Sequence, residues 1–139
     1  MKVIVDTSVW SLALRKADYN KNNLFVKELV ELINEGRVQM IGPIRQELLS
    51  GIKFVEQFKK LKKTLSFFPD CQIKSYDYEK AAELFNHCRK NGIQGSNTDF
   101  LICAIAINHN MTILTVDKDF SNINKFISDL KLIQPRFII

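Results

Sequence analysis

Four carboxylates occupy matching positions along this 139-residue sequence. Asp6 ends the β-branched run Val-Ile-Val, and Asp117 ends an apolar run that begins at Met111. Glu47 lies in the first turns of a helix predicted after the second apolar run, and Asp99 lies in the first turn of a predicted buried helix. In a parallel sheet, strand carboxyl ends and the N-termini of the following helices share one edge. We therefore expect these four side chains to meet there.

Such a cluster needs a counter-charge. Carboxylates a few ångströms apart raise one another's pKa and take up protons unless a cation keeps them ionised. Helix dipoles, worth about 0.3–1 kcal/mol each, are too weak to do this. All-oxygen ligation suits Mg²⁺ or Mn²⁺, which keep several waters and use substrate phosphate as a further ligand. The predicted chemistry is metal-assisted hydrolysis of a phosphodiester.

Each acid also has a purely structural interpretation. Asp6 suits a turn or an N-cap, Asp99 a cap, Glu47 a solvated helix face and Asp117 a helix start. Taken jointly, these interpretations require the same coincidence at every strand end, so we favour the metal site.

Alternating apolar runs predict the elements that position these acids. Strands are predicted at 2–5, 38–41 and 111–116, with a short edge strand at Ile73 and a last strand from 132–133 and 137–139. Helices are predicted at 9–15, 22–36, 43–50, 55–66, 77–90, 98–107 and 117–123. This order predicts an α/β fold: a three-layer α/β/α sandwich around a mainly parallel sheet. The length predicts a single domain over 1–139.

Composition and charge narrow the setting. No apolar run reaches the ~18 residues of a membrane helix and no secretory signal is recognisable, so we expect a cytoplasmic protein without a membrane partner. The net charge of +5 favours a polyanionic partner but does not identify one. Five lysines gather between 53 and 63, either as a phosphate track or as solvated helix faces.

The acids lie within four motifs that resemble those of the PIN-domain ribonucleases, and most closely the VapC toxins of toxin–antitoxin pairs. The motifs are VIVDTSVW at 3–10, GPIRQELLSG at 42–51, NTDFLICAIA at 97–106 and LTVDKDF at 114–120. Any one of them is weak, whereas four in this order and at these spacings are specific. The resemblance covers nearly the full length.

The resemblance implies an endoribonuclease that requires Mg²⁺ or Mn²⁺, is usually a homodimer and is silenced by a cognate antitoxin protein. Carried over by position, its catalytic metal ligands are Asp6, Glu47, Asp99 and Asp117, with Asp119 as an alternative ligand in the last motif. The hydroxyls of Thr7 and Thr115 are expected to orient water or a carboxylate. Arg45 is expected to contact RNA phosphate or the antitoxin, or to lie on the surface.

Three other functions stay open from the sequence. A stand-alone RNA-processing nuclease would use the same fold and metal. A non-catalytic RNA-binding or scaffold domain would need no intact acids, although all four are present. A regulatory module that is phosphorylated at Asp6 would need a suitably placed lysine, which the sequence lacks after its strands.

Overall fold

The computed structural model describes residues 1–14 and 22–137 of the chain. Its centre is a parallel sheet in the order β2-β1-β3, formed by β1 (Val3–Val5), β2 (Val38–Gln39) and β3 (Thr112–Leu114). All three β1 residues are fully buried. A central strand covered on both faces requires a continuous apolar run, and Val-Ile-Val supplies it.

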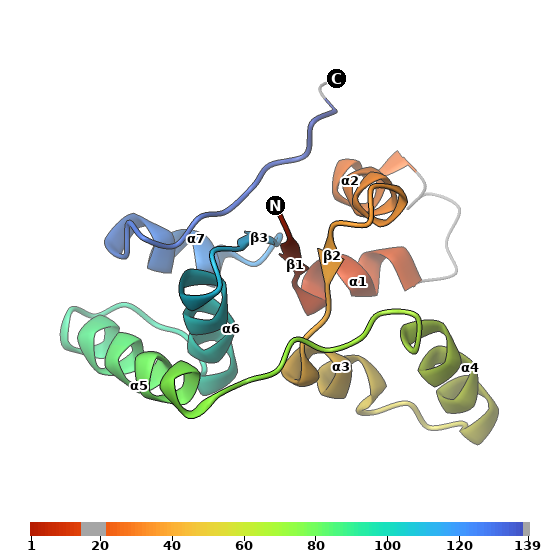
Figure 1. The fold of residues 1–139 in the computed structure, drawn as a ribbon, viewed down its shortest axis with the longest axis horizontal. Helices are drawn as coiled ribbons and strands as arrows, with labels where there is room; N and C mark the ends of the chain where they lie inside the picture. Colours follow the sequence, from red (N-terminus) through yellow and green to blue (C-terminus); the bar gives the residue numbers. More distant parts are fainter. Residues whose placement is uncertain (15–21, 138–139) are drawn as a thin grey trace.

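Helices flank this sheet on both sides (Figure 1). Within the described residues they are α1 (Thr7–Leu14), α2 (Leu24–Asn34), α3 (Gly42–Leu49), α4 (Val55–Leu65), α5 (Ser75–Lys90), α6 (Asn97–Asn108) and α7 (Lys118–Phe126). Figure 1 shows α1 and α2 on one side of the strands, and α5 and α6 on the other. The predicted α/β fold with a parallel sheet between helical layers is confirmed. None of the described helices is long and apolar enough to cross a membrane.

The third strand is shorter than predicted. It ends at Leu114, and the backbone N–H of Val116 donates to the Ser8 hydroxyl at 3.2 Å instead of to a neighbouring strand. Two residues predicted as strand therefore belong to the loop that leads into α7. That helix continues to Phe126, beyond the predicted end at 123, and Phe126 packs against the core beside the buried Phe120 and Ile123.

The predicted edge strands are reduced to single bridges. No strand forms at Ile73, and Asp70 instead bridges Met40 in parallel orientation. On the opposite edge, Leu132 bridges Ile113. The predicted pairing of 137–139 falls partly outside the described residues. A single apolar side chain that packs against the core gives the same sequence pattern as a short edge strand. Apolar character alone therefore could not predict whether an edge strand forms.

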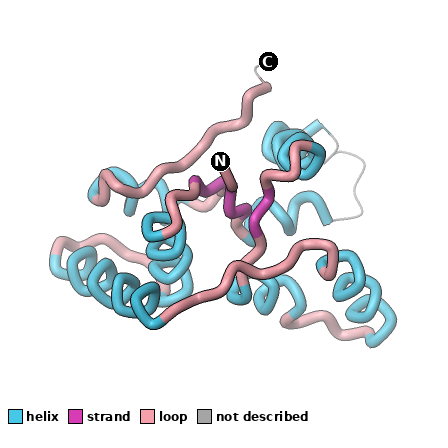
Figure 2. Tube along the Cα trace, in the orientation of Figure 1, coloured by secondary structure: helices cyan, strands magenta, loops and turns pink. Residues whose placement is uncertain are grey.

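An arginine ties the C-terminal segment to α2. Figure 2 shows the chain after α7 as loop. The Arg136 guanidinium donates to the buried Glu28 carboxylate at 2.8 Å and to Glu35 at 2.7 Å. Hydrogen bonds from Arg136 lower the pKa of Glu35 to about 2. The ion pairs of Arg136 thus attach the C-terminal segment to α2, although the segment has no regular secondary structure.

A second polar tie joins the start of α5 to the end of α6. The Asp77 carboxylate is fully buried and accepts hydrogen bonds from the Lys74 N–H and the Asn108 amide, both at 2.9 Å. His109 Nε2 lies 3.2 Å from each of its oxygens. Burial raises the pKa of Asp77, but these hydrogen bonds outweigh burial, so the pKa lies below its usual value.

The stability that the ionised Asp77 carboxylate contributes should therefore decrease at low pH. A carboxyl group with a lowered folded pKa contributes its full stability above the unfolded value of about 3.9 and loses it as the pH falls through the folded value. We expect Asp77→Asn to lower the free energy of unfolding by roughly 1–3 kcal/mol at neutral pH. The difference from the parent should shrink below about pH 4. Urea unfolding across pH tests this, with the exposed Asp129→Asn as control; a difference constant with pH contradicts it.

Candidate active site

Asp6 is held at the tip of β1 by two hydroxyl groups. Its side chain is buried, with 6% exposure, and its Oδ2 accepts hydrogen bonds from Ser8 Oγ at 2.7 Å and Thr115 Oγ1 at 2.9 Å. Its own carbonyl accepts the N–H groups of the first turn of α1. Within the described residues, Oδ1 accepts no hydrogen bond. One oxygen therefore fixes the carboxylate and the other is left for a ligand.

Thr115 links Asp6 to the last acidic motif. The Thr115 hydroxyl donates to Asp6 and accepts the backbone N–H of Asp117 at 3.0 Å. Asp117 in turn caps α7, since its Oδ1 accepts the N–H of Asp119 at 2.9 Å. One threonine thus sets the relative positions of two acids that are far apart in the sequence.

Asp99 is oriented by a reciprocal capping box at the start of α6. Ser96 Oγ accepts the Asp99 N–H at 3.1 Å, and Asp99 Oδ2 accepts the Ser96 N–H at 3.0 Å. The preceding residue, Gly95, packs against the core: an added Cβ would lie 2.9 Å from the buried Phe100 ring. Only glycine lets the loop approach this closely, so the box is pressed onto the core.

The four acids lie near enough to repel one another. Partial burial raises the pKa of Glu47, the Thr7 hydroxyl lowers it, and the charges of Asp6 and Asp99 raise it, with a net increase. Burial also raises the pKa of Asp99, and the charges of Asp117 and Asp6 add to this against the Ser96 hydrogen bonds. The sequence-predicted carboxylates are therefore brought together on one rim.

The donor set suits a hard divalent cation that keeps its waters. Among residues 1–14 and 22–137, no three His, Cys, Asp or Glu side chains are arranged as a ready metal cage. Mg²⁺ is usually held by one or two carboxylates, waters and substrate phosphate instead of such a cage. Thr7 Oγ1 is buried without a hydrogen-bond partner of normal geometry, although it lies close enough to Glu47 to affect its pKa. An orphaned oxygen beside clustered carboxylates fits an ion with its bound water.

Two predicted residues also have surroundings of their own. Asp119 lines a separate hollow with Gly92 and Lys125, and its backbone supports Asp117. Arg45 is engaged within the chain: it forms an ion pair with Asp70 at 3.0 Å and donates to backbone carbonyls of residues 65 and 68. Arg45 thus braces the chain internally, and its expected contact with RNA phosphate or antitoxin stays a prediction.

Two site residues were missed in the sequence. Ser8 holds Asp6 and the loop after β3, and Ser96 holds Asp99. Both had a readable signal. Asp6-x-Ser8 is the spacing at which a hydroxyl turns back to a preceding carboxylate, and Ser96-x-x-Asp99 is the spacing of a capping box.

Thr115 should control metal affinity without touching the ion. We expect Thr115→Val to weaken Mg²⁺ or Mn²⁺ binding about 10–100-fold, the usual effect of losing a group that orients a ligand. Thr115→Ser should retain the affinity. Thr112→Val, three residues earlier in β3, is a matched control, because the Thr112 hydroxyl is buried and has no partner among the described residues. Calorimetric titration measures this, and equal affinities for Thr115→Val and Thr112→Val would contradict the assigned role.

Known proteins resemble this chain in sequence and fold. Ribonuclease VapC11 of Mycobacterium tuberculosis is 29% identical over 122 residues, which span 85% of this chain and 88% of that protein. The crystal structure of FitAcB from Neisseria gonorrhoeae matches with a TM-score of 0.76 and 21% identity, over 98% of this chain and 99% of that one. VapBC2 from Rickettsia felis, bound to a DNA fragment from the promoter, matches with a TM-score of 0.73 and 25% identity, over 96% and 98%.

The family model called PIN domain matches residues 3–126. This span contains all four acids and every strand of the sheet. The resemblance inferred from the four motifs is confirmed, and the chain belongs to the PIN domain family.

Proposed function

We propose that this chain is a Mg²⁺- or Mn²⁺-dependent endoribonuclease that acts in the cytoplasm as the toxin of a toxin–antitoxin pair. The observation that carries the proposal is the rim of four carboxylates, where burial and then the neighbouring charges raise the pKa of Glu47 and Asp99. An arrangement that repels itself is useful if a cation completes it. The similarity to proteins named VapC ribonuclease supports RNA as the substrate.

Asp6, Glu47, Asp99 and Asp117 would hold the ion. When bound, the ion polarises a phosphoryl oxygen and lowers the pKa of bound water. Asp6 keeps its orientation through Ser8 and Thr115, so little ordering remains to be done when substrate arrives.

Glu47 is the most exposed of the four acids, so water can reach its carboxylate. In the proposed hydrolysis, water attacks phosphorus and its proton passes to Glu47. The bond from phosphorus to O3′ breaks, and O3′ takes up a proton. The products are a 5′-phosphate and a 3′-hydroxyl.

Removing one carboxylate charge tests the reaction. Metal polarisation supplies several kcal/mol, so we expect Asp6→Asn and Asp99→Asn to slow RNA cleavage in Mg²⁺ by roughly 10²–10⁴-fold. Added Mg²⁺ should raise the melting temperature of the parent and not that of Asp6→Asn. The exposed Asp129→Asn is the charge-matched control. Cleavage by either site variant at the parent rate rules out the assignment.

The toxin role predicts a protein partner and a homodimer. Solved structures with this fold are named as the pairs VapBC2 and FitAcB, which supports an antitoxin for this chain. We expect a small protein encoded beside the gene to co-purify with the chain. Co-expression of that small protein should restore the growth of cells that express the chain. Light scattering of the chain alone should give twice the mass of one copy. A stand-alone nuclease would cleave RNA and fail both the co-purification and the growth test.

A further inference from the structure

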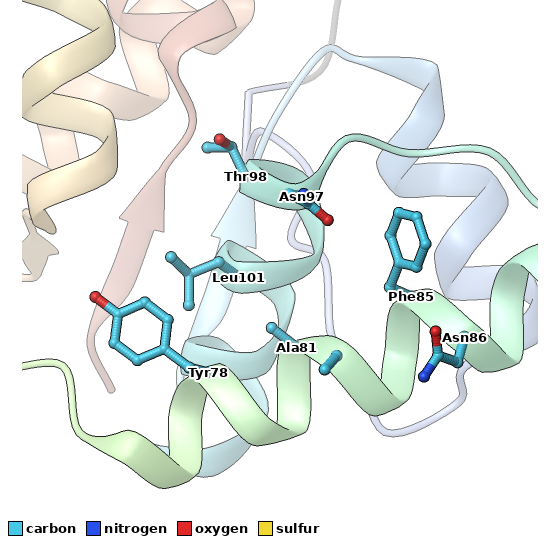
Figure 3. Close-up of a pocket in the computed structure, with 8 residues that line it drawn as sticks. Tyr78, Ala81, Phe85, Asn86, Asn97, Thr98 and Leu101 are labelled. Carbon is cyan, nitrogen blue, oxygen red and sulfur yellow. The ribbon is translucent and has the colours of Figure 1, made fainter.

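A hollow of about 400 Å³ lies between α5 and α6 (Figure 3). Tyr78 and Thr98 lie at one end in Figure 3, and Phe85 and Asn86 at the other. Ala81 and Ala82 of α5 line the bottom of the hollow, and their small side chains leave the space open. The volume is within the range of pockets that hold small ligands.

A tyrosine and two asparagines line this hollow, and their polar groups make no hydrogen bond within the described residues. Tyr78 is 55% exposed. In the described part of the chain, the side-chain amides of Asn86 and Asn97 make no hydrogen bond to protein. Such amides have one acceptor and two donors, which is the pattern that pairs with the edge of a nucleobase.

A free cation stands at the far end of the hollow. Arg89 follows Phe85 by one helical turn, and its guanidinium carbon lies 5.2 Å from the centre of the Phe85 ring. No acid of the described ranges lies within ion-pair distance of Arg89, whereas Lys80 on the same helix pairs with Glu83. Stacking on the ring orients Arg89 and leaves its donors for an anion.

The opposite end of the hollow adjoins the acids. Asn97 and Thr98 form the start of α6 and directly precede Asp99, and neighbouring Cα atoms are about 3.8 Å apart. An RNA strand with one phosphate at the carboxylate rim would therefore place its next nucleotide over the hollow and a further phosphate near Arg89.

We propose that this hollow binds one nucleobase of the substrate RNA, next to the phosphate that is cleaved. The inference rests on the proposed ribonuclease function and adds the subsite that selects the base. Tyr78 stacks on the base, Asn86 and Asn97 contact its edge, and Arg89 binds a neighbouring phosphate. Single-stranded RNA is bound by this combination of an aromatic platform and basic groups.

Binding without cleavage separates the subsite from the reaction. Fluorescent single-stranded hexamers of A, C or U are titrated in EDTA with the full chain and its variants. We expect Tyr78→Ala to weaken binding of the preferred hexamer roughly 5- to 100-fold, and Tyr78→Phe to retain it. Asn97→Ala should reduce the difference in affinity between the A, C and U hexamers. Arg89→Ala should reduce the slope of log affinity against log salt by about 0.7.

Matched controls lie outside the hollow. Phe67, 75% exposed, is an aromatic control, and Lys90 is an exposed cation beside Arg89. Phe67→Ala and Lys90→Ala should keep the base preference of the parent. If Tyr78→Ala and Phe67→Ala lose the same affinity for the hexamers, the subsite is wrong. It is also wrong if Tyr78→Ala binds RNA normally but has a different mass in solution. If Tyr78→Ala binds normally and Asp6→Asn no longer cleaves, the subsite is wrong and the ribonuclease function stands.

Discussion

Repulsion among four carboxylates is the constraint that the rest of this structure accommodates. A parallel sheet sends the carboxyl ends of its strands to one edge, and here an acid stands at or close behind each of them. Burial raises the pKa of Glu47 and Asp99, and the charges of the neighbouring acids raise it further. Folding must hold these groups together before any cation arrives, so the core has to offset their repulsion.

The hydrogen bonds at the rim answer that constraint by fixing the acids from behind. Ser8 and Thr115 both donate to one oxygen of Asp6, and Ser96 holds Asp99. These groups are neutral, so they orient the carboxylates without neutralising them. A lysine in the same place would form an ion pair and remove the need for a metal ion.

The same logic fixes both ends of α6. At its start, Asp99 and Ser96 form the capping box, and at its end Asn108 and His109 contact the buried Asp77 of α5. Between them the helix is apolar on nearly all sides and lies in the core. A buried helix with a polar tie at each end cannot slide along its axis, so Asp99 keeps its place on the rim.

The sequence predicted the central features because each rests on a strong local pattern. The run ending at Asp6 and the helix after Asp99 are buried on all sides, and such segments are continuous in apolar residues. The edges were less predictable, since Ile73 and Leu132 are apolar yet neither lies in a regular strand. The contacts of Arg45 are with Asp70 and with carbonyls at and after the end of α4, 20 or more residues away, and no local pattern carries that information.

The division between acids and hollow also separates two kinds of change. Asp6 and Asp99 are held by several hydrogen bonds and lie against the core, so altering their neighbours disturbs the fold as well as the chemistry. The side chains of Tyr78, Asn86 and Arg89 are exposed on α5, and none of them is a residue of the buried core. If the proposed subsite and reaction hold, a change at the hollow would alter which RNA base is preferred and leave the carboxylate rim intact.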